Sequence, residues 1–420
     1  MITTPKPGPC RLVADADRTY AVLWQNEHFP EVARGGGGAV NTKYICRALA
    51  EAGHRPVIVA RAVPPRSAGT EIAEGLMVVR LEAPRPSRIL WPLWPLLEAR
   101  PLRRLLAPLA ALSDVLCAVD ASYANALKGM FPERPLLYRV EGLPSEGARA
   151  PEALTRAGRA ALRVLALAAQ LAERLAWRRA DVLVVKSAFM RDALVQEHRA
   201  PAEKILVIPN GVDFDRFAHA ETSTALRAWT AADGQPHIVI AFSGRLVAMK
   251  NVSGLLRAFA LMRNRERVRL LVVGDGDQRP ALEEQARALG VAARCFFTGL
   301  TDRVEQFLAA ADIFVLPSTY EPFGNALVEA MAAGVAPVAF RPDGHRIRTA
   351  SAEIIRDGET GILADHPSPD NLARVLDELV QNPDLRRRLG RRAQEDCRNR
   401  FSWKKCAEAY IEAAAAVQRR

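Results

Sequence analysis

Short apolar runs alternate with longer segments of helical periodicity along most of the chain. The apolar runs at 20–26 and 55–61 predict strands, and the segment 34–54 between them predicts a helix that opens with a glycine run. A strand, a glycine loop, a helix and a second strand make a βαβ unit on a parallel sheet. Further strands are expected at 75–81, 113–119 and 134–140, and a strand followed by a helix at 180–194.

The same alternation starts again after residue 236. A strand that ends in a Pro-Asn-Gly turn occupies 204–217, and the Ala-, Thr-, Asp- and Gly-rich residues 218–235 predict a linker. Strands and helices then alternate as a parallel sheet requires, and residues 385–420 are expected to be helical throughout. The pattern predicts an α/β fold of two Rossmann-like, doubly wound parallel sheets that face each other across a cleft, where ligands bind at the carboxyl ends of the strands.

Length and composition agree with two soluble domains. The 420 residues exceed what one ordinary core accommodates, and 49% hydrophobic with 25% charged residues is typical of globular proteins. No run approaches the roughly 20 uncharged apolar residues that span a bilayer, and residues 1–18 lack the apolar core of a signal peptide. The six scattered cysteines and seven dispersed histidines lack metal-ligand spacing. A cytoplasmic protein with reduced thiols and no protein-bound metal is expected.

The excess of basic residues favours a polyanionic partner. Lys and Arg number 58 against 47 Asp and Glu, a net charge of +11, although a compositional bias towards arginine accounts for part of it. No nucleic-acid-binding motif is present, so anionic lipids and phosphorylated small molecules remain. Residues 85–104 mix Trp91 and Trp94 with several arginines, which suits peripheral contact with the inner face of an anionic cytoplasmic membrane; the alternative is a packed cap on the sheet with its arginines extended to water.

Two segments predict a diphosphate site. In "SGRLVAMKN" (243–251), a strand ends at Gly244 and the cations Arg245 and Lys250 precede a helix. Cations beside a helix N-terminus attract phosphate oxygens, although two solvated loop charges would give the same pattern. The glycine run 35–38 allows the backbone to approach a ligand closely.

A third segment supplies carboxylates. In "EPFGNALVE" (321–329), Glu321 follows a predicted strand and Glu329 lies two turns into the next predicted helix. A carboxylate accepts hydrogen bonds from two hydroxyls, as a sugar diol requires, and the turn between the acids presents backbone amides. Cations, a glycine loop and spaced acids on one cleft match a nucleoside-diphosphate sugar. The segment "VGDGD" (273–277) lacks the third glycine of a dinucleotide fingerprint, which disfavours a dehydrogenase.

In this order the motifs resemble the retaining glycosyltransferases of family 4, also called glycosyl transferases group 1, which have the GT-B fold. The resemblance is densest after residue 180, and its most specific element is Glu321-x7-Glu329 with Arg245-x4-Lys250 upstream. The other matching segments are the glycine loop and helix 36–54, then 180–194, 204–217, 270–290, 296–300, 312–338, 353–363 and 401–403.

The resemblance implies a domain for each substrate. Residues 1–210 would form the acceptor-binding domain, on which a C-terminal helix at about 401–420 packs back, and 211–400 the nucleotide-sugar domain. Retention of the anomeric configuration without a metal is implied. The implied catalytic residues are Arg245, Lys250 and Glu321. Donor contacts are implied for Gly36 and Gly37 (β-phosphate), Gly244, Arg245 and Lys250 (diphosphate), Gly299 and Leu300 (nucleobase), Glu321 with the backbone of Phe323, Gly324, Asn325, Ala326 and Leu327 (sugar), and Glu329 (ribose).

The chain departs from the family pattern in two places. Many members have a histidine near the reacting carbon where this chain has Glu141. A second histidine that is frequent in the family is replaced in this chain around Cys117 and Val119. Glu141 is therefore a candidate catalytic residue on the acceptor side, with an ordinary loop acid as the alternative. The loop 341–355 is longer than usual and keeps only Gly344 before Glu353, so His345 or Arg346 is expected to reach the cleft.

The leading interpretation is a hexosyltransferase. It would use a UDP- or GDP-sugar, hold no permanent cofactor, and glycosylate a lipid-linked, polysaccharide or other glycoconjugate acceptor in cell-surface polysaccharide biosynthesis. A GT-B sugar-nucleotide epimerase would need cleft histidines that the sequence does not place. A catalytically silent scaffold subunit is the alternative from a different class, and the intact Arg245, Lys250, Glu321 and Glu329 set disfavours it.

Overall fold

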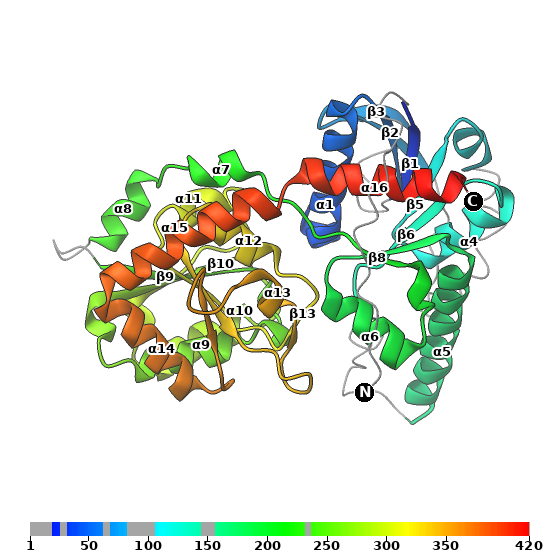
Figure 1. Ribbon diagram of the computed structural model, residues 1–420. Coiled ribbons are helices and arrows are strands. Elements are labelled where there is room, and N and C mark those ends of the chain that lie inside the picture. Colours follow the sequence, from blue (N-terminus) through cyan, green and yellow to red (C-terminus); the bar gives the residue numbers. More distant parts are fainter. Residues whose placement is uncertain are drawn as a thin grey trace, which may run out of the picture. The chain divides into compact units, whose positions relative to one another are not determined.

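The computed structural model describes residues 19–25, 32–61, 68–81, 106–143, 156–231 and 237–419. It divides into two compact units (Figure 1). The first unit comprises Met1–Val185, Leu194–Ile208 and Lys404–Arg420, and the second comprises Lys186–Ala193 and Pro209–Trp403. Each unit contains a parallel sheet with helices packed against it, which confirms the predicted α/β class.

The described sheet of the first unit has the strand order β3-β4-β2-β1-β5-β6-β7-β8. All pairs are parallel except β3 with β4. The sequence pattern missed β3, a short and mostly exposed edge strand. It pairs with β4 across a two-residue turn at Glu74 and Gly75, whose φ angles are 56° and 76°. The strands are β1 (Ala21–Gln25), β2 (Arg55–Arg61), β3 (Gly69–Ala73), β4 (Leu76–Leu81), β5 (Val115–Ala118), β6 (Leu136–Arg139), β7 (Val182–Val185) and β8 (Ile205–Val207).

The predicted glycine loop is wrong in one respect. Helix α1 (Val32–Glu51) begins before the glycine run, so Gly36 and Gly37 lie in its first turns and not in a loop. Four glycines disfavour a helix by about 1 kcal/mol each relative to alanine. Packing of the following turns outweighs this, because Ile45, Cys46 and Leu49 are fully buried. Other described helices of this unit include α4 (Ala121–Met130), α5 (Arg156–Arg179), the end of α6 (Ala188–His198) and α16 (Trp403–Gln418).

The second unit has an all-parallel described sheet in the order β11-β10-β9-β12-β14-β16. Numbered from β9, this is the 3-2-1-4-5-6 order of nucleotide-binding folds, with the switch point between β9 and β12. The strands are β9 (Ile238–Ser243), β10 (Val268–Val273), β11 (Cys295–Phe297), β12 (Ile313–Leu316), β14 (Ala336–Phe340) and β16 (Ile362–Ala364). The main helices are α7 (Phe214–Ala218), α8 (Thr224–Thr230), α9 (Val252–Leu261), α10 (Arg279–Ala288), α11 (Val304–Leu308), α12 (Asn325–Ala332), α13 (Ser351–Ile354), α14 (Pro369–Gln381) and α15 (Pro383–Arg400).

Two predictions for the second half are wrong. The supposed linker contains α8, which Ser223 caps by accepting the Leu226 amide, and Leu226 is buried. The C-terminal segment is not helical throughout, because it breaks between α15 and α16. There the Phe401 carbonyl accepts the Val212 amide and the Phe401 ring packs 5.9 Å from that of Phe323. These tertiary contacts outweigh local helix propensity.

The carboxyl edge of the second sheet depends on a glycine that no other residue replaces. Gly274 has a φ of 129°, and a Cβ atom there would lie 2.1 Å from the Gly244 carbonyl oxygen. We expect Gly274→Ala to lower the free energy of unfolding by about 3 kcal/mol, measured by urea denaturation. The control Gly344→Ala has a φ of 76° but open space around it, so it loses only about 1 kcal/mol. Equal losses would refute the steric argument.

Candidate functional site

The loops that leave β9 and β12 meet at the switch point of the second sheet. Gly244 follows β9, and its amide donates to the Val273 carbonyl at the end of the neighbouring strand β10. The Thr319 amide, beyond β12, donates to the Met249 carbonyl at 2.8 Å. These bonds hold the loop 243–251, which is the predicted diphosphate loop, against the loop that carries Glu321.

Lys250 and Glu321 form an ion pair across these two loops. Their side chains are only 18% and 14% exposed, and the Lys250 Cε atom lies 3.9 Å from where a Gly244 Cβ would stand. The structure therefore brings Gly244, Lys250 and Glu321 together at the carboxyl edge of the second sheet. Partial burial strengthens the attraction between the charges and orients the Glu321 carboxylate.

Arg245 lies on the same loop but is exposed. Among the described residues, no hydrogen bond or ion pair holds its guanidinium. The side chain can therefore turn towards an incoming anion without first breaking an internal bond. Because a guanidinium binds two phosphate oxygens at once, this position suits a diphosphate.

Glu321 is further fixed by a small sheet that the sequence did not predict. Strand β13 (Tyr320–Glu321) pairs in parallel with β15 (Arg348–Thr349), and the Ala350 amide donates to the Glu321 carbonyl at 3.0 Å. The unusual loop 341–355 thereby fixes the backbone of Glu321. At the loop's tip, Asp343 accepts the amides of residues 345–347 at 2.8 Å each. His345 and Arg346 are exposed there, and their predicted reach to a ligand stays a prediction.

Gly324 begins the helix that follows the first acid. Its φ of 107° turns the chain into α12, while the Phe323 side chain is buried. Helix geometry leaves the amide of Ala326, in the first turn of α12, without an intrahelical acceptor. The Leu327 amide instead donates to the Gly324 carbonyl at 2.9 Å, so it is already engaged.

Glu329 lies one turn into α12, rather than the two turns predicted. It is partly buried, and burial raises the pKa of its carboxyl to about 7, although Arg216 opposes the shift. Arg216 itself bonds Glu305 at 2.6 Å. A carboxyl that is costly to leave ionised gains most from hydrogen-bond donors such as a ribose diol.

Gly299 and Leu300 follow β11. Gly299 has a φ of 76° and forms a bridge with Gly274, which holds this loop against the end of β10. Leu300 is 67% exposed. An exposed leucine on a fixed loop offers an apolar contact to a flat base, and this role stays a prediction.

The first unit places Glu141 two residues beyond β6. Its Oε1 atom accepts from Arg139 Nε at 2.6 Å, and Arg139 in turn donates to the Tyr410 hydroxyl of α16 at 2.8 Å. A Cβ on Gly38 of the glycine run would lie 3.7 Å from the Glu141 carboxyl carbon. Glu141 and the glycine run are thus neighbours. The sequence analysis missed Arg139 and Tyr410; the signal was an arginine inside the apolar run "LLYRV".

The described residues hold no group of three or more His, Cys, Asp or Glu suited to a metal ion. Within the same ranges, no helix is long and apolar enough to cross a membrane. The segment 85–104, predicted to contact a membrane, lies outside the described residues.

Two family models match most of the chain. The model described as Glycosyltransferase Family 4 matches residues 35–216, and that described as Glycosyl transferases group 1 matches residues 229–396. The chain belongs to glycosyltransferase family 4. The chain has the two parallel-sheet domains of the GT-B fold class.

Curated relatives of this family 4 chain include two named glycosyltransferases. It is 34% identical over 177 residues to the lipopolysaccharide core biosynthesis glycosyltransferase LpsE of Rhizobium meliloti. The aligned region covers 42% of this chain and 49% of LpsE. It is 34% identical over 248 residues to the D-inositol 3-phosphate glycosyltransferase of Nocardia farcinica, and the aligned region covers 57% of this chain and 53% of that relative. The chain thus spans about half the length of the curated relatives it matches.

Solved structures share the fold over nearly the whole family 4 chain. Sucrose-phosphate synthase from Thermosynechococcus elongatus aligns with a TM-score of 0.73 at 19% identity, covering 93% of this chain and 97% of that one. Anabaena HepE in complex with UDP and glucose aligns with a TM-score of 0.71 at 21% identity, covering 94% and 100%.

The raised pKa of Glu329 predicts a pH dependence of stability. Between pH 4.5 and about 7 the unfolded chain loses this proton while the folded chain keeps it, so the free energy of unfolding falls as pH rises. We expect Glu329→Gln to remove up to about 3 kcal/mol of the loss between pH 5 and pH 8. Denaturant unfolding at both pH values measures this.

Glu173, whose pKa burial also raises to about 7, contributes a similar slope that should remain in the Glu329→Gln variant. Glu378→Gln, at a 60% exposed side chain on α14, is the matched control and should leave the slope unchanged. A Glu329→Gln protein with the wild-type slope would contradict the assignment.

Proposed function

We propose that this family 4 protein is a retaining, metal-independent hexosyltransferase that uses a nucleoside-diphosphate sugar. The observation that carries the proposal is the Lys250–Glu321 ion pair beside Gly244 at the switch point of the second sheet. Arg245 on the same loop and Glu329 on the following helix complete a set with cations for a diphosphate and carboxylates for hydroxyls. We assign donor binding to residues 211–400 and acceptor binding to 1–210 with the C-terminal helix.

In the proposed reaction, Arg245 and Lys250 bind the donor diphosphate and stabilise the charge that grows on it as the sugar leaves. One oxygen of Glu321 stays on Lys250, which leaves the other to accept a sugar hydroxyl. The acceptor oxygen bonds to the anomeric carbon on the face from which the diphosphate departs. The bond from that carbon to the phosphate oxygen breaks, and a donor phosphate oxygen takes the acceptor's proton.

We assign the nucleobase and ribose contacts to other residues at the carboxyl edge of the second sheet. Glu329 accepts the ribose hydroxyls, and Gly299 and Leu300 border the base. The amides that open α12 add donors for the sugar. Gly36 and Gly37 lie against the β-phosphate. UDP and GDP are the proposed nucleotides, and the HepE structure of the same fold, titled as a complex with UDP and glucose, supports the first.

For the acceptor we propose a lipid-linked, polysaccharide or other glycoconjugate chain in cell-surface polysaccharide biosynthesis. The names of LpsE and LpsD of Rhizobium meliloti, both lipopolysaccharide core biosynthesis glycosyltransferases, support this direction. Glu141, held by Arg139 beside the glycine run, is the proposed acceptor-side carboxylate. We place the protein in the cytoplasm, with 85–104 against the inner face of the cytoplasmic membrane.

A nucleotide screen tests the donor site. A ligand that binds only the folded protein raises its Tm, so we expect UDP or GDP, and the matching sugar conjugate, to raise it in a thermal-shift assay. Lys250→Ala should abolish that shift and lower donor hydrolysis or transfer at least about a hundredfold, because the leaving diphosphate loses a cation.

Lys404→Ala is the matched control, since this lysine is exposed at the start of α16. It should keep both the shift and the activity. Full activity in Lys250→Ala would overturn the donor-site assignment. The absence of any nucleotide shift together with the absence of turnover would favour a binding or scaffold subunit.

A further inference from the structure

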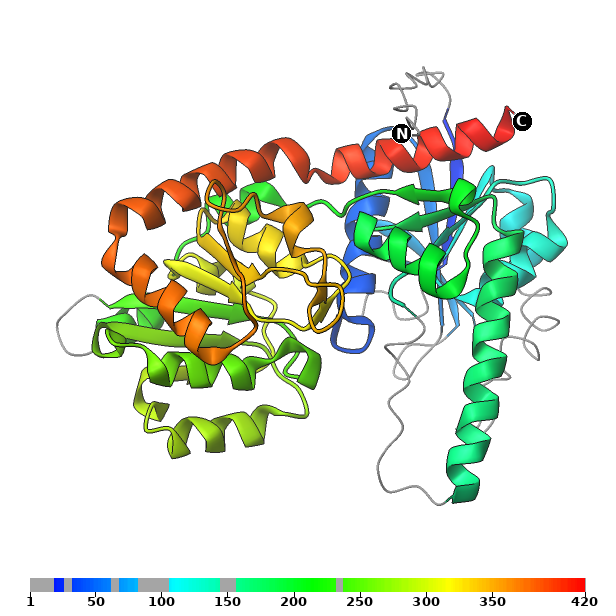
Figure 2. The same cartoon turned by 60° about the horizontal axis from the view of Figure 1, so that its bottom comes forward.

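Arg216, on the short helix α7, links separate parts of the second unit. Figure 1 and Figure 2 show α7 on the same side of the second sheet as α11, α12 and α15, against which it packs. The Arg216 Nη2 atom donates to the Asp302 carbonyl at 2.5 Å and to the Glu305 carboxylate, near the start of α11, at 2.6 Å. Asp302 follows Gly299 and Leu300 in the loop predicted to border the base. One guanidinium therefore joins α7 to this loop and to α11.

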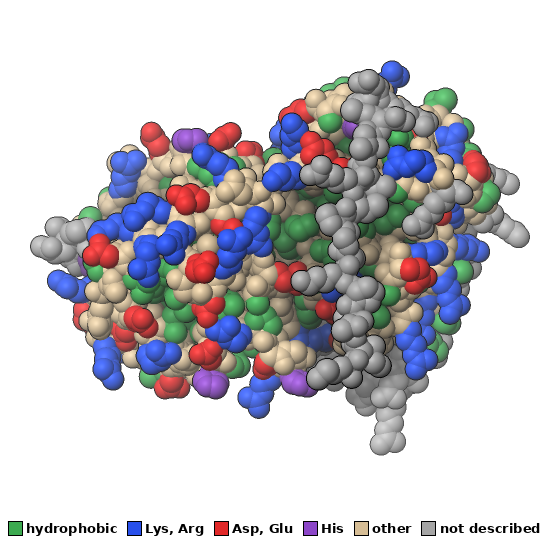
Figure 3. Space-filling view, in the orientation of Figure 1, with side chains coloured by type: hydrophobic (Ala, Val, Ile, Leu, Met, Phe, Trp, Pro, Cys, Tyr) green, Lys and Arg blue, Asp and Glu red, His purple; other side chains and the backbone are tan. Residues whose placement is uncertain are grey.

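This contact differs from an ordinary surface ion pair. Figure 3 shows acidic and basic side chains intermingled over the second unit. Exposed pairs of this kind, such as Arg387 with Asp384, contribute little to stability. The Glu305 side chain is only 16% exposed, and the guanidinium that donates to it also binds a backbone carbonyl. Low exposure strengthens the attraction between the charges, so we expect Arg216 to keep this arrangement.

Both charges of this pair act on Glu329, the acid of α12 that we assign to the ribose. Burial raises the pKa of the Glu329 carboxyl to about 7, while Arg216 opposes the rise and Glu305 adds to it. A carboxyl with this pKa is about half ionised at neutral pH, so a nearby charge of either sign changes its ionised fraction strongly. The balance between Arg216 and Glu305 therefore determines how much carboxylate is present.

The other elements packed against α12 hold their polar groups differently. Strands β12 and β14 consist of apolar residues. The Cys397 thiol of α15 donates to the Val328 carbonyl at 3.5 Å, and burial raises the pKa of this thiol to about 12, so it is neutral. Charged groups on the surrounding helices include Asp215 (exposed), Asp396 (paired with Arg400), Arg398 (over the Phe214 ring) and Glu353 (accepting the Ala188 and Phe189 amides). Among the described groups, Arg216 and Glu305 are thus the charges that reach Glu329.

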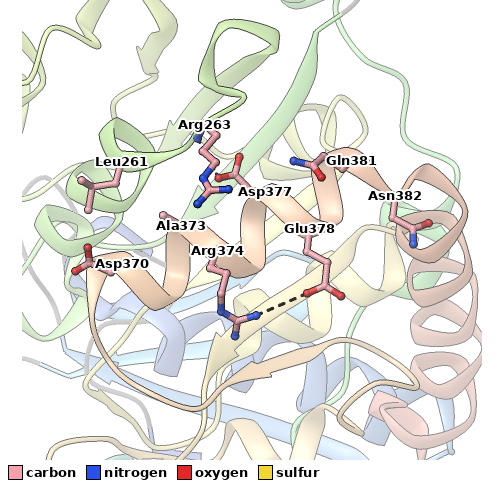
Figure 4. A pocket seen from close by; sticks show the side chains of 9 residues that line it. All are labelled: Leu261, Arg263, Asp370, Ala373, Arg374, Asp377, Glu378, Gln381 and Asn382. Carbon is pink, nitrogen blue, oxygen red and sulfur yellow. Dashed lines mark hydrogen bonds and ion pairs between the residues drawn. The ribbon is translucent and has the colours of Figure 1, made fainter.

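The groove between α9 and α14 holds an ion pair without such a connection (Figure 4). Arg374 Nη1 and Glu378 Oε2 lie 4.0 Å apart within α14, and both side chains are exposed. The groove encloses about 810 Å³, but the Asp377 carboxylate that lines it already accepts the Arg263 and Asn264 amides. The described residues that line it are not among those assigned to the donor. Arg374 and Glu378 therefore serve as a matched pair of control positions.

We propose that Arg216 and Glu305 are positioning residues for the donor ribose. Arg216 holds the loop 299–303 beside Glu329 and stabilises the carboxylate form of this acid, while Glu305 limits that stabilisation by binding the same guanidinium. The inference rests on the proposed contact between Glu329 and the ribose hydroxyls. A carboxylate accepts from both hydroxyls, whereas a protonated carboxyl uses one oxygen as a donor. Donor affinity therefore follows the charge on Glu329.

Isothermal titration of the full chain with UDP-glucose at several pH values tests this role; GDP-glucose replaces it if GDP is the nucleotide that raises the Tm. The sugar conjugates lack the phosphate monoester proton with a pKa of about 6, so the ligand itself does not titrate near neutrality. In the wild type we expect affinity to rise with pH and to level off at about pH 7, where the free protein has already lost the Glu329 proton. An analogue without the ribose 2′-hydroxyl should show a weaker rise.

The variants should move the levelling point in opposite directions. Arg216→Gln removes the cation and should raise it by about one pH unit, whereas Glu305→Gln removes the competing anion and should lower it by about the same amount. Arg216→Lys keeps a positive charge and should stay close to the wild type. The controls Arg374→Gln and Glu378→Gln should match the wild type, and Glu329→Gln should bind without this dependence on pH.

Two outcomes would overturn the proposal while leaving the donor site intact. The first is loss of the pH dependence in Glu329→Gln together with wild-type curves in both Arg216→Gln and Glu305→Gln. The second is a shift in the same direction in both variants, which would mean that they act through folding and not through charge. A wild-type curve in Glu329→Gln would instead refute the ribose contact on which the inference rests. Donor binding by Lys250→Ala reports separately on the proposed diphosphate site.

Discussion

The ion pair between Lys250 and Glu321 joins the loops that leave the neighbouring strands β9 and β12. The two residues are 71 positions apart in sequence, and only the switch in strand order makes their loops neighbours. Gly274, just after β10, allows the neighbouring loop after β9 to lie close, since a side chain at Gly274 would collide with the Gly244 carbonyl. The pair fixes the carboxylate that faces the proposed sugar and holds the ammonium beside the proposed diphosphate.

Charge at this edge is distributed unevenly, and the distribution suits the proposed ligand. Lys250 and Glu321 neutralise each other, whereas Arg245 is exposed without an internal partner among the described residues. Glu329 is disfavoured as an anion because burial raises the pKa of its carboxyl. This edge therefore has an exposed cation for the proposed phosphate and a carboxyl that gains from the proposed hydroxyl donors.

In the first unit, too, a cation orients a carboxylate. Arg139 is buried, and it holds Glu141 through one nitrogen and the α16 residue Tyr410 through another. Glu141 is thus a carboxylate with a fixed orientation.

The sequence by itself determined the alternation of strands and helices, the spacing of Arg245, Lys250, Glu321 and Glu329, and the family, because these depend on local periodicity and short motifs. It could not show the edge strand β3, the helix α8 in the supposed linker or the break at Phe401, where tertiary contacts outweigh local propensity. Only the tertiary structure decided that Lys250 bonds Glu321 and that Arg139 holds Glu141. Such contacts depend on which strands become neighbours, and one-dimensional patterns do not record this.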